Sequence, residues 1–342
     1  MKQGSRVHKE LEEQVHTTVK VDVKTKEDGW GLRIWNVIQG LRTLRDTGLT
    51  RELEVWGTVD GLVVNGIIDE LSFVCPDKDL EESLEKPAKD EPPLDQPTIA
   101  EFFKTAGSST LETIRNKRHH QSNKIYLCDV KTRSVRSLPA EIAFRPTKMQ
   151  LMLYHNLLSA LAMNSVDFSI LADRYKLDPS RVFSDSFIAE VGSLNDETFY
   201  DAPSTLAGSQ DSITNWSQDS MTTLLAHNTL SALWSLMISE FQIALPDGAA
   251  SLGNILKAEY RSRDTGEVVG SKTFAMDERG LKGYLDKEMQ WWRGEREAQG
   301  VVVEEAFKCR SCEFAEGCEW RLQKVEEANE KVRMRMKRTA VV

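Results

Sequence analysis

Apolar and polar residues follow two different periods along this chain, and each period predicts its own kind of element. Apolar residues recur at helical spacing through residues 30–45, and Gly48 follows them, which predicts a helix that ends at this glycine. The period changes to two over residues 53–59, and a turn at Asp60-Gly61 leads into a second apolar stretch at 63–74. This pattern predicts a β-hairpin.

The same two periods continue along the rest of the chain. They predict an amphipathic helix at residues 8–15, a strand at 125–132, a helix that begins at Pro146 and runs to 163, a hairpin at 254–275, and helices at 277–296 and at the C-terminus. Residues 164–252 have a mostly helical pattern, with joints rich in Ser and Asp. This order of elements predicts an α/β fold, in which helices flank a mixed sheet.

Charge is unevenly distributed over the 342 residues. The formal net charge is −9, but residues 76–101 alone hold nine acidic residues, three lysines and five of the ten prolines. We expect this stretch to be a disordered or loosely held insertion, and without it the rest of the chain is nearly neutral. This balance excludes a protein that holds nucleic acid by bulk positive charge, but it permits local basic patches.

The most apolar stretch of the chain does not have the composition of a membrane span. Residues 220–239 carry no charged side chain, yet nine of these twenty positions are Ser, Thr, Asn or His. Such polar residues are costly at the centre of a bilayer, so the stretch predicts a buried helix. The first residues, MKQGSRVHKELEEQ, show neither an apolar signal core nor the acid-free pattern of a transit peptide.

Two predicted strands carry acidic residues in apolar surroundings. Asp69 ends an apolar run, and Asp129 and Lys131 lie two residues apart, so they share one face of their strand. A buried carboxylate is costly unless it is paired or binds a metal. Two converging carboxylates suit one or two Mg²⁺ (or Mn²⁺) ions, which would activate a water for attack on a phosphate. The alternative is that these residues are solvated positions of ordinary strands.

The helix predicted after the second of these strands adds two polar side chains. Gln150 and Tyr154 are four residues apart, so they share one helical face. Both side chains can hydrogen-bond a lysine or a phosphate. The alternative is that they form the polar rim of a helix that packs on the core.

Three of the five cysteines lie close together near the C-terminus, where Cys309, Cys312 and Cys318 have the spacing C-x₂-C-x₅-C. The aromatic residues nearest to them are Phe307, Phe314 and Trp320. Thiolates at this spacing can converge on one metal centre, and the aromatic side chains would shield a cluster. Zinc and iron–sulfur clusters both need four ligands, so the spacing alone leaves the metal open.

Several short segments together resemble one family of nucleases. They are G-x-x-x-H-x-x-L-E from Gly4, T-R-E-x-x-V-x-G from Thr50, G-I-I-D-E from Gly66, D-V-K-T-R from Asp129 and Q-L-M-L-Y-H from Gln150. These segments look like the RecB-type branch of the PD-(D/E)xK nucleases. The C-terminal run from Trp291 to Arg321 holds the three cysteines. It is similar to exonuclease V, the iron–sulfur single-strand exonuclease family of eukaryotic cells.

The resemblance implies a role for each matching residue. The residues that would bind the catalytic metal are His8, Asp69, Asp129 and, through its carbonyl oxygen, Val130. Lys131 would be the catalytic lysine, and Gln150 and Tyr154 would lie beside it and the scissile phosphate. Without the resemblance, His8 would be interpreted as an ordinary surface residue.

The resemblance also implies a [4Fe–4S] cluster on Cys309, Cys312 and Cys318. The family's fourth cysteine is expected upstream of Gly4, and this sequence has no cysteine before Cys75. One explanation is a truncated N-terminus, which would also hide a targeting segment, and the other is a different fourth ligand. The first explanation is favoured because the chain opens directly on the first matching motif.

Taken with the element pattern, these inferences predict five regions. Residues 1–75 and 123–165 would form the PD-(D/E)xK nuclease core. Residues 76–122 would be an acidic and then basic insertion, partly disordered. Residues 166–252 would form a helical region, and 253–342 a hairpin, a helix, the iron–sulfur segment and a basic tail.

The predicted function is metal-dependent exonucleolytic hydrolysis of single-stranded DNA, with a role in nuclear or mitochondrial DNA maintenance. We expect a monomer with no membrane partner, and a single-strand-binding protein is a candidate partner. Residues expected to contact DNA are Arg115, Lys117, Arg118, Arg133, Lys331, Arg333, Arg335, Lys337 and Arg338. The alternative is a single-strand-binding module with a structural metal cluster and an inactive nuclease site. The joint presence of Asp69, Asp129 and Lys131 speaks against it.

Overall fold

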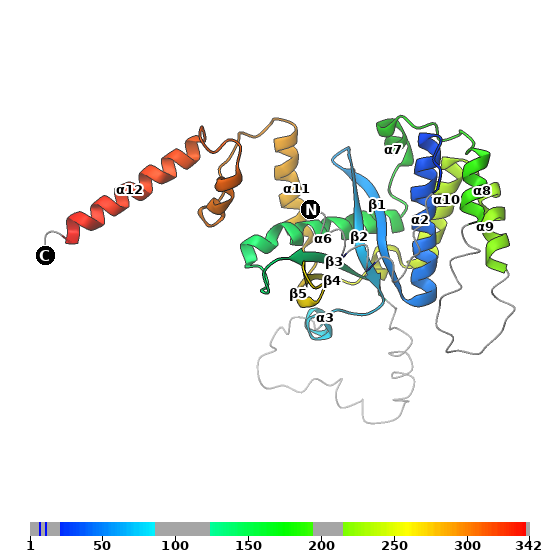
Figure 1. Cartoon of the computed structure of the whole chain (residues 1–342), viewed down its shortest axis with the longest axis horizontal. Helices are drawn as coiled ribbons and strands as arrows, with labels where there is room; N and C mark the ends of the chain where they lie inside the picture. The colour runs from blue at the N-terminus through cyan, green and yellow to red at the C-terminus, as the bar shows by residue number, and fades with distance from the viewer. Residues whose placement is uncertain (1–6, 8–10, 12–20, 86–123, 194–214, 340–342) are drawn as a thin grey trace, which may run out of the picture. The chain divides into compact units, whose positions relative to one another are not determined.

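One mixed sheet connects segments that lie far apart in the sequence (Figure 1). The computed structural model describes Val7, Leu11 and residues 21–85, 124–193 and 215–339. Within this part of the chain the strands are β1 (Leu49–Val59), β2 (Leu62–Ser72), β3 (Tyr126–Arg133), β4 (Ile255–Ser262) and β5 (Val268–Ala275), which is also their order in the sheet. Only β3 and β4 pair in parallel, and the other neighbouring pairs are antiparallel. The predicted α/β class is confirmed.

Both predicted hairpins are present, and their turns have the backbone angles that hairpins require. Between β1 and β2, Asp60 and Gly61 have φ values of 52° and 81°, and the favoured two-residue turn needs positive φ at both positions. Between β4 and β5, Gly266 has a φ of 73°. Because β4 then pairs with β3, the predicted catalytic strand lies in the middle of the sheet.

The first long helix, α2 (Lys26–Thr47), begins earlier than the apolar stripe predicts and ends at Gly48, as expected. Its start is fixed by a capping box. The Asp28 N–H donates to Thr25 Oγ1 (3.0 Å), and the Thr25 N–H donates to Asp28 Oδ2 (3.1 Å). These bonds satisfy two backbone donors at the helix start, so the helix extends back past its first apolar residue.

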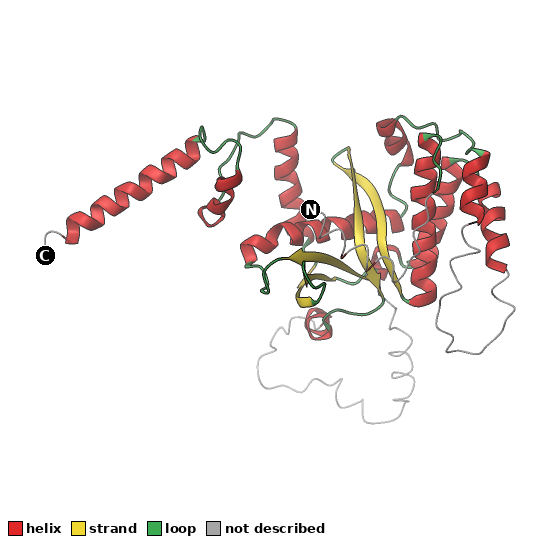
Figure 2. Ribbon diagram, in the orientation of Figure 1, coloured by secondary structure: helices red, strands yellow, loops and turns green. Residues whose placement is uncertain are grey.

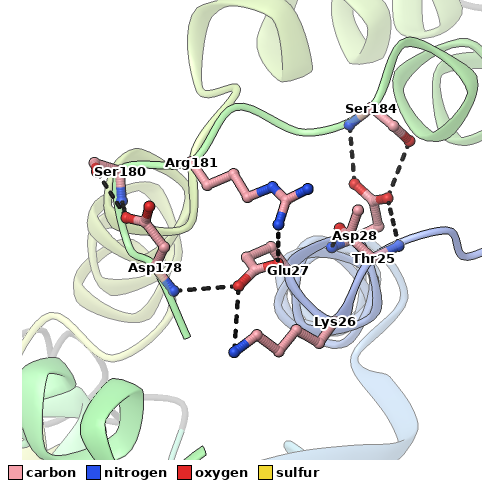
Figure 3. Close-up of polar contacts among 8 residues, drawn as sticks. All are labelled: Thr25, Lys26, Glu27, Asp28, Asp178, Ser180, Arg181 and Ser184. Atoms are coloured by element: carbon pink, nitrogen blue, oxygen red, sulfur yellow. Dashed lines mark hydrogen bonds and ion pairs between the residues drawn. The ribbon is translucent and has the colours of Figure 1, made fainter. Parts of the chain in front are cut away.

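Two buried carboxylates join the start of α2 to the segment before α8 (Asp185–Ser193), as Figure 3 shows. Asp28 accepts hydrogen bonds from the backbone N–H (2.9 Å) and the hydroxyl (3.0 Å) of Ser184. Glu27 accepts from the Asp178 N–H (3.2 Å) and lies 3.5 Å from an Arg181 nitrogen. The positive end of the helix dipole favours carboxylates here, so the two acids connect segments that are distant in sequence.

The uncharged stretch at 220–239 forms parts of two helices rather than the single buried helix expected. α9 (Asn215–Ala226) ends, and Thr229 then caps α10 (Leu230–Ala244) by accepting from the Ala232 N–H (3.3 Å). α10 packs against α2, where its buried Glu240 accepts from Arg42 (2.8 Å) and Arg45 (2.6 Å). Among the described residues, no helix combines the length and the apolar character that a membrane crossing needs.

The helix after β3 starts earlier than predicted, so the prediction that Pro146 begins it is wrong. α6 (Glu141–Ala162) is continuous through Pro146. Its added first turn buries Phe144, whose N–H donates to the Ala140 carbonyl (2.9 Å). A proline is favoured in the first turn of a helix, but burial of an aromatic residue upstream of it extends the helix towards the N-terminus.

The acidic insertion is expected to be partly disordered, and its first part forms a helix. α3 (Lys78–Glu85) lies within it, and Asp77 caps this helix by accepting from the Leu80 N–H (3.0 Å). Asp77 also accepts from the Thr273 hydroxyl on β5 (2.7 Å). The helix is therefore fixed to the sheet edge by a side-chain hydrogen bond that an acidic composition does not predict. Residues 86–123 of the insertion lie outside the described part of the chain.

The chain divides into two compact units. The unit that holds the sheet comprises residues 1–138 and 147–278, and it also contains α7 (Phe168–Tyr175) and a short 3₁₀ helix (Gly248–Ser251). The second unit comprises residues 139–146 and 279–342. Its main elements are α11 (Glu278–Trp292), η3 (Val303–Ser311) and α12 (Glu319–Thr339). In its described residues, the second unit is built of helices and loops (Figure 2).

Candidate active site

Asp69 and Asp129 meet where the pairing between β2 and β3 stops. The two strands pair from Ser72 opposite Tyr126 to Glu70 opposite Cys128, and the register ends there. At the next position Asp69 Oδ2 accepts a hydrogen bond from the Val130 N–H (2.5 Å). The side chain of Asp69 thus takes the place of a backbone acceptor, and its carboxylate lies against the peptide that links Asp129 to Val130.

Lys131 compensates the charge of a nearly inaccessible carboxylate. Asp129 is 2% exposed, and the Lys131 ammonium lies 2.9 Å from its Oδ1. Removing a carboxylate from water costs several kcal/mol unless charges or hydrogen bonds replace the lost hydration. On β4, the strand that pairs with β3 on the side away from β2, the small residue Ala258 pairs with Asp129. The sequence prediction that Asp129 and Lys131 share a face of β3 agrees with this contact.

A chain of hydrogen bonds extends from Lys131 along α6. The Lys131 ammonium donates to Gln150 Oε1 (3.1 Å), and Gln150 Nε2 donates to the Tyr154 hydroxyl (2.9 Å). The structure therefore brings together five of the predicted residues: Asp69, Asp129, Lys131, Gln150 and Tyr154. They come from β2, β3 and α6, and all five residues belong to the same compact unit.

The carboxylates of Asp69 and Asp129 suit a hard divalent cation, since such ions prefer carboxylate oxygens. They form a partial ligand set: in the described residues, no group of three or more His, Cys, Asp or Glu side chains is arranged to hold a metal. His8, the third predicted side-chain ligand, lies outside the described residues. Its neighbours in sequence, Val7 and Leu11, form a buried apolar cluster with Val130. The donor chemistry at β2 and β3 thus fits the predicted metal.

Sequence reasoning missed Tyr260, which lies beside Lys131 in the sheet. Tyr260 on β4 is 4% exposed and pairs with Lys131 in the parallel register. Burial is the main cause that raises the pKa of the Tyr260 phenol, and the negative charge of Asp129 adds to it. Arg133 lies over the Tyr260 ring, with its Cζ 5.7 Å from the ring centroid. Arg133, predicted to contact DNA, is therefore close to the carboxylate site.

The cysteine segment does not form a comparable site. Cys312 is exposed and Cys309 and Cys318 are half-buried, and η3 contains no buried residue. In the described residues the three thiols are not gathered into a metal-binding group, so the structure does not show the predicted convergence. Phe307 and Phe314 are 54% and 78% exposed, whereas Trp320 is half-buried, and the shielding of a cluster by these side chains stays a prediction.

The remaining cysteines do not complete a ligand set in this structure. Cys128 is buried on β3, and burial raises the pKa of its thiol well above the ordinary value. Burial also raises the pKa of the Cys75 thiol. Because thiolates rather than thiols bind metals, both environments disfavour the ligand form. As described, the residues present do not fit a four-thiolate cluster.

The predicted DNA contacts fall into three groups. Arg115, Lys117 and Arg118 lie outside the described residues. Arg133 is half-buried on β3, beside the carboxylate site. Lys331, Arg333 and Arg335 are exposed on α12. The side chains of Lys337 and Arg338, although these residues belong to α12, lie outside the described set.

Comparison with known proteins decides the family. The family model described as exonuclease V, a 5′ deoxyribonuclease, matches residues 1–321. The chain belongs to the exonuclease V family. It is also similar to exonuclease V of Danio rerio, with 23% identity over 320 residues, which cover 93% of this chain and 61% of that relative. The chain therefore spans about three fifths of the length of this curated relative.

The exonuclease V match includes all five residues that the structure gathers, and the three C-terminal cysteines. It ends at residue 321, near the start of α12. Lys331, Arg333 and Arg335 therefore lie beyond the matched part of the chain, so the family gives them no support as DNA contacts.

Proposed function

We propose that this chain is a metal-dependent exonuclease that hydrolyses the phosphodiester bonds of single-stranded DNA. The observation that carries the proposal is the contact of Lys131 with both Asp129 and Gln150, directly beside the Asp69 carboxylate. Family membership supports the reaction class, since the matching family is described as a 5′ deoxyribonuclease. Attack from the 5′ end, dependence on a metal and preference for single strands are parts of the proposal.

Asp69 and Asp129 would hold the metal, which when bound acidifies a water and neutralises charge on the phosphate. Lys131 has three N–H donors, and Asp129 and Gln150 accept two of them. The third can donate to a water or a phosphate oxygen. An ammonium fixed in this way stabilises charge that develops on the phosphate without further reorganisation. The hydrogen bond from Val130 to Asp69 keeps that carboxylate beside Asp129.

DNA would be held by local basic side chains rather than by bulk charge, because the net charge of the chain is −9. Arg133 lies near the carboxylates, and the basic residues of α12 offer a second contact with the backbone. We extend the proposal to a role in nuclear or mitochondrial DNA maintenance, for a monomer that meets DNA coated with a single-strand-binding protein. A [4Fe–4S] cluster on the three cysteines stays a prediction from the resemblance.

The test is a degradation time course on single-stranded DNA labelled at the 5′ or the 3′ end, with Mg²⁺ or EDTA. We expect release of short products from the 5′ end with Mg²⁺ and none with EDTA. Asp129→Ala should abolish release, whereas Asp264→Ala in the β4–β5 turn should not. Binding of DNA without cleavage under every condition would contradict the proposal and favour an inactive binding module.

A further inference from the structure

Gly66 leaves the space that Tyr154 occupies. A Cβ atom added at Gly66 would lie 2.2 Å from Cε1, 2.7 Å from Cζ and 3.0 Å from the hydroxyl oxygen of Tyr154. Gly66 is buried on β2 and does not have a positive φ, so its backbone conformation is open to any residue. The need for glycine here is therefore steric, because the tyrosine ring lies directly against the strand.

Gln150 joins the Tyr154 hydroxyl to the Lys131 ammonium through its side-chain amide. A glutamine amide has two donors at one end and an acceptor at the other. The Lys131 ammonium can only donate, so Gln150 Oε1 accepts from it (3.1 Å), and Gln150 Nε2 is left to donate to the Tyr154 hydroxyl (2.9 Å). The reverse orientation would place NH₂ donors against a cation. Lys131 therefore sets the orientation of the amide, and the hydrogen bond to Tyr154 holds the other end of the Gln150 side chain in place.

We propose that Gly66 is a positioning residue, which seats Tyr154 and thereby fixes Gln150 and the Lys131 ammonium. The proposal rests on the function proposed above, in which Lys131 acts on the phosphate. It assigns a second role to β2, since this strand also carries Asp69, three residues further on. One strand would then place both a metal-binding carboxylate and the seat of the hydrogen-bond chain that orients the lysine.

A purely structural role for Gly66 makes a different prediction, and the same hairpin supplies the control. Gly57 on β1 is also buried against α6, where an added Cβ would lie 2.6 Å from Leu157 Cδ2. Leu157 takes no part in the hydrogen-bond chain. Gly57→Ala therefore reports the cost of crowding α6 against the hairpin, without a change at Lys131.

The experiment is a double-mutant cycle of Gly66→Ala and Tyr154→Phe, with kcat and KM measured on single-stranded DNA. Displacing a positioned group by about 1 Å can reduce a rate by about a hundredfold. We expect each single variant to lower kcat by about that factor with little change in KM. The double variant should be no slower than the slower single variant, because both changes break the same contact. Gly57→Ala should leave kcat within about twofold of the wild type.

Multiplied losses in the double variant, or an equal loss in Gly57→Ala, would overturn the inference while leaving the proposed function intact. A second readout does not depend on activity. The side-chain NH₂ resonances of Gln150, assigned by their absence in Gln150→Glu, should shift in Gly66→Ala as they do in Tyr154→Phe. Gly57→Ala should leave them in place. An unshifted Gln150 resonance in Gly66→Ala would show that Gly66 does not position Gln150 through Tyr154, even if the wild type cleaved no DNA.

Discussion

The carboxylate site and the cysteine segment were predicted from equally short motifs, yet the structure builds only the first. Asp69, Asp129 and Lys131 lie on β2 and β3, where the adjacent residues Ile68, Cys128 and Val130 are buried. The pairing register of the sheet fixes the position of each strand. Cys309 lies in η3, which has no buried residue, and Cys312 and Cys318 lie after it, outside any helix. A packed scaffold brings ligands together before a ligand binds, whereas an exposed loop depends on the ligand itself for its geometry.

The largest expected effect is on catalysis, in the region that the sheet organises. Lys131→Met keeps the volume of the side chain but removes the charge between Asp129 and Gln150. We expect kcat on single-stranded DNA to fall by about a thousandfold, the upper range for losing one transition-state donor. Lys282→Met on α11, which is exposed, is the control. Rates within a few-fold of the wild type would show that Lys131 is only a structural partner of Asp129.

The second prediction concerns the metal content of the cysteine segment. If a metal completes this segment, protein purified without air should contain iron and inorganic sulfide, and Cys312→Ala should lose both. Cys75→Ala, in the other unit, is the matched control and should retain them. Metal analysis and absorbance near 400 nm measure the outcome. One zinc for each chain with no iron would contradict the cluster prediction.

Substitutions in the sheet should destabilise the protein more than substitutions in the cysteine segment, because only the sheet is tightly packed. Ile68 on β2 is 1% exposed, whereas Phe314 in the cysteine segment is 78% exposed. Ile68→Ala should reduce the free energy of unfolding by about 2–5 kcal/mol through lost burial and the resulting cavity. Phe314→Ala should change it by less than about 0.5 kcal/mol in metal-free protein. Urea unfolding followed by circular dichroism compares them, and equal losses would show that Phe314 is packed in solution.

A smaller effect concerns acid stability at the start of α2. Burial alone would raise the pKa of Asp28, but hydrogen bonds from Ser184 and Thr25 outweigh it and hold the pKa below its ordinary value. A lowered folded-state pKa adds stability above the unfolded-state pKa of about 4, and this stability is lost as the pH falls through the folded-state value. Unfolding free energies at pH 7 and pH 3 should therefore differ more in the wild type than in Asp28→Asn. The same difference in both proteins would show that Asp28 does not contribute to the pH dependence of stability.

The smallest effect is expected on α12, beyond the family match. Replacing Lys331, Arg333 and Arg335 with Gln should weaken DNA binding at low salt. It should also reduce the slope of log affinity against log salt by about two, as loss of three phosphate contacts from a single strand requires. Replacing Arg279, Lys282 and Lys287, three exposed residues of α11, with Gln is the charge-matched control. An unchanged slope would mean that the α12 residues only solvate the helix.

The sequence correctly predicted those features that depend only on a few neighbouring residues. The turn at Asp60-Gly61 and the shared face of Gln150 and Tyr154 follow from short-range geometry, and the structure contains both. Tyr260 could not be predicted, because its place beside Lys131 depends on a parallel pairing between strands separated by the whole helical region. The start of α6 was missed for a related reason, since burial of Phe144 is a tertiary effect.

The contact between Gly66 and Tyr154 could not be predicted from the sequence either. A glycine inside a strand indicates a bulge or a close approach, but the identity of the approaching group is visible only in the folded chain. The motif supplied the residue types of the site, while the contacts among Gly66, Tyr154 and Gln150 came from the packing of α6 on the hairpin.

The most direct test of the central claim is Mn²⁺ binding to the carboxylate pair, followed by electron paramagnetic resonance. If Asp69 and Asp129 form the metal site that supports hydrolysis, the wild type should bind Mn²⁺ and cleave DNA with it. Asp129→Asn should weaken Mn²⁺ binding by at least about tenfold and lose cleavage in parallel. Asp264→Asn should leave both properties unchanged. Equal Mn²⁺ affinity and equal cleavage in the wild type and Asp129→Asn would show that Asp129 neither binds the metal nor supports hydrolysis.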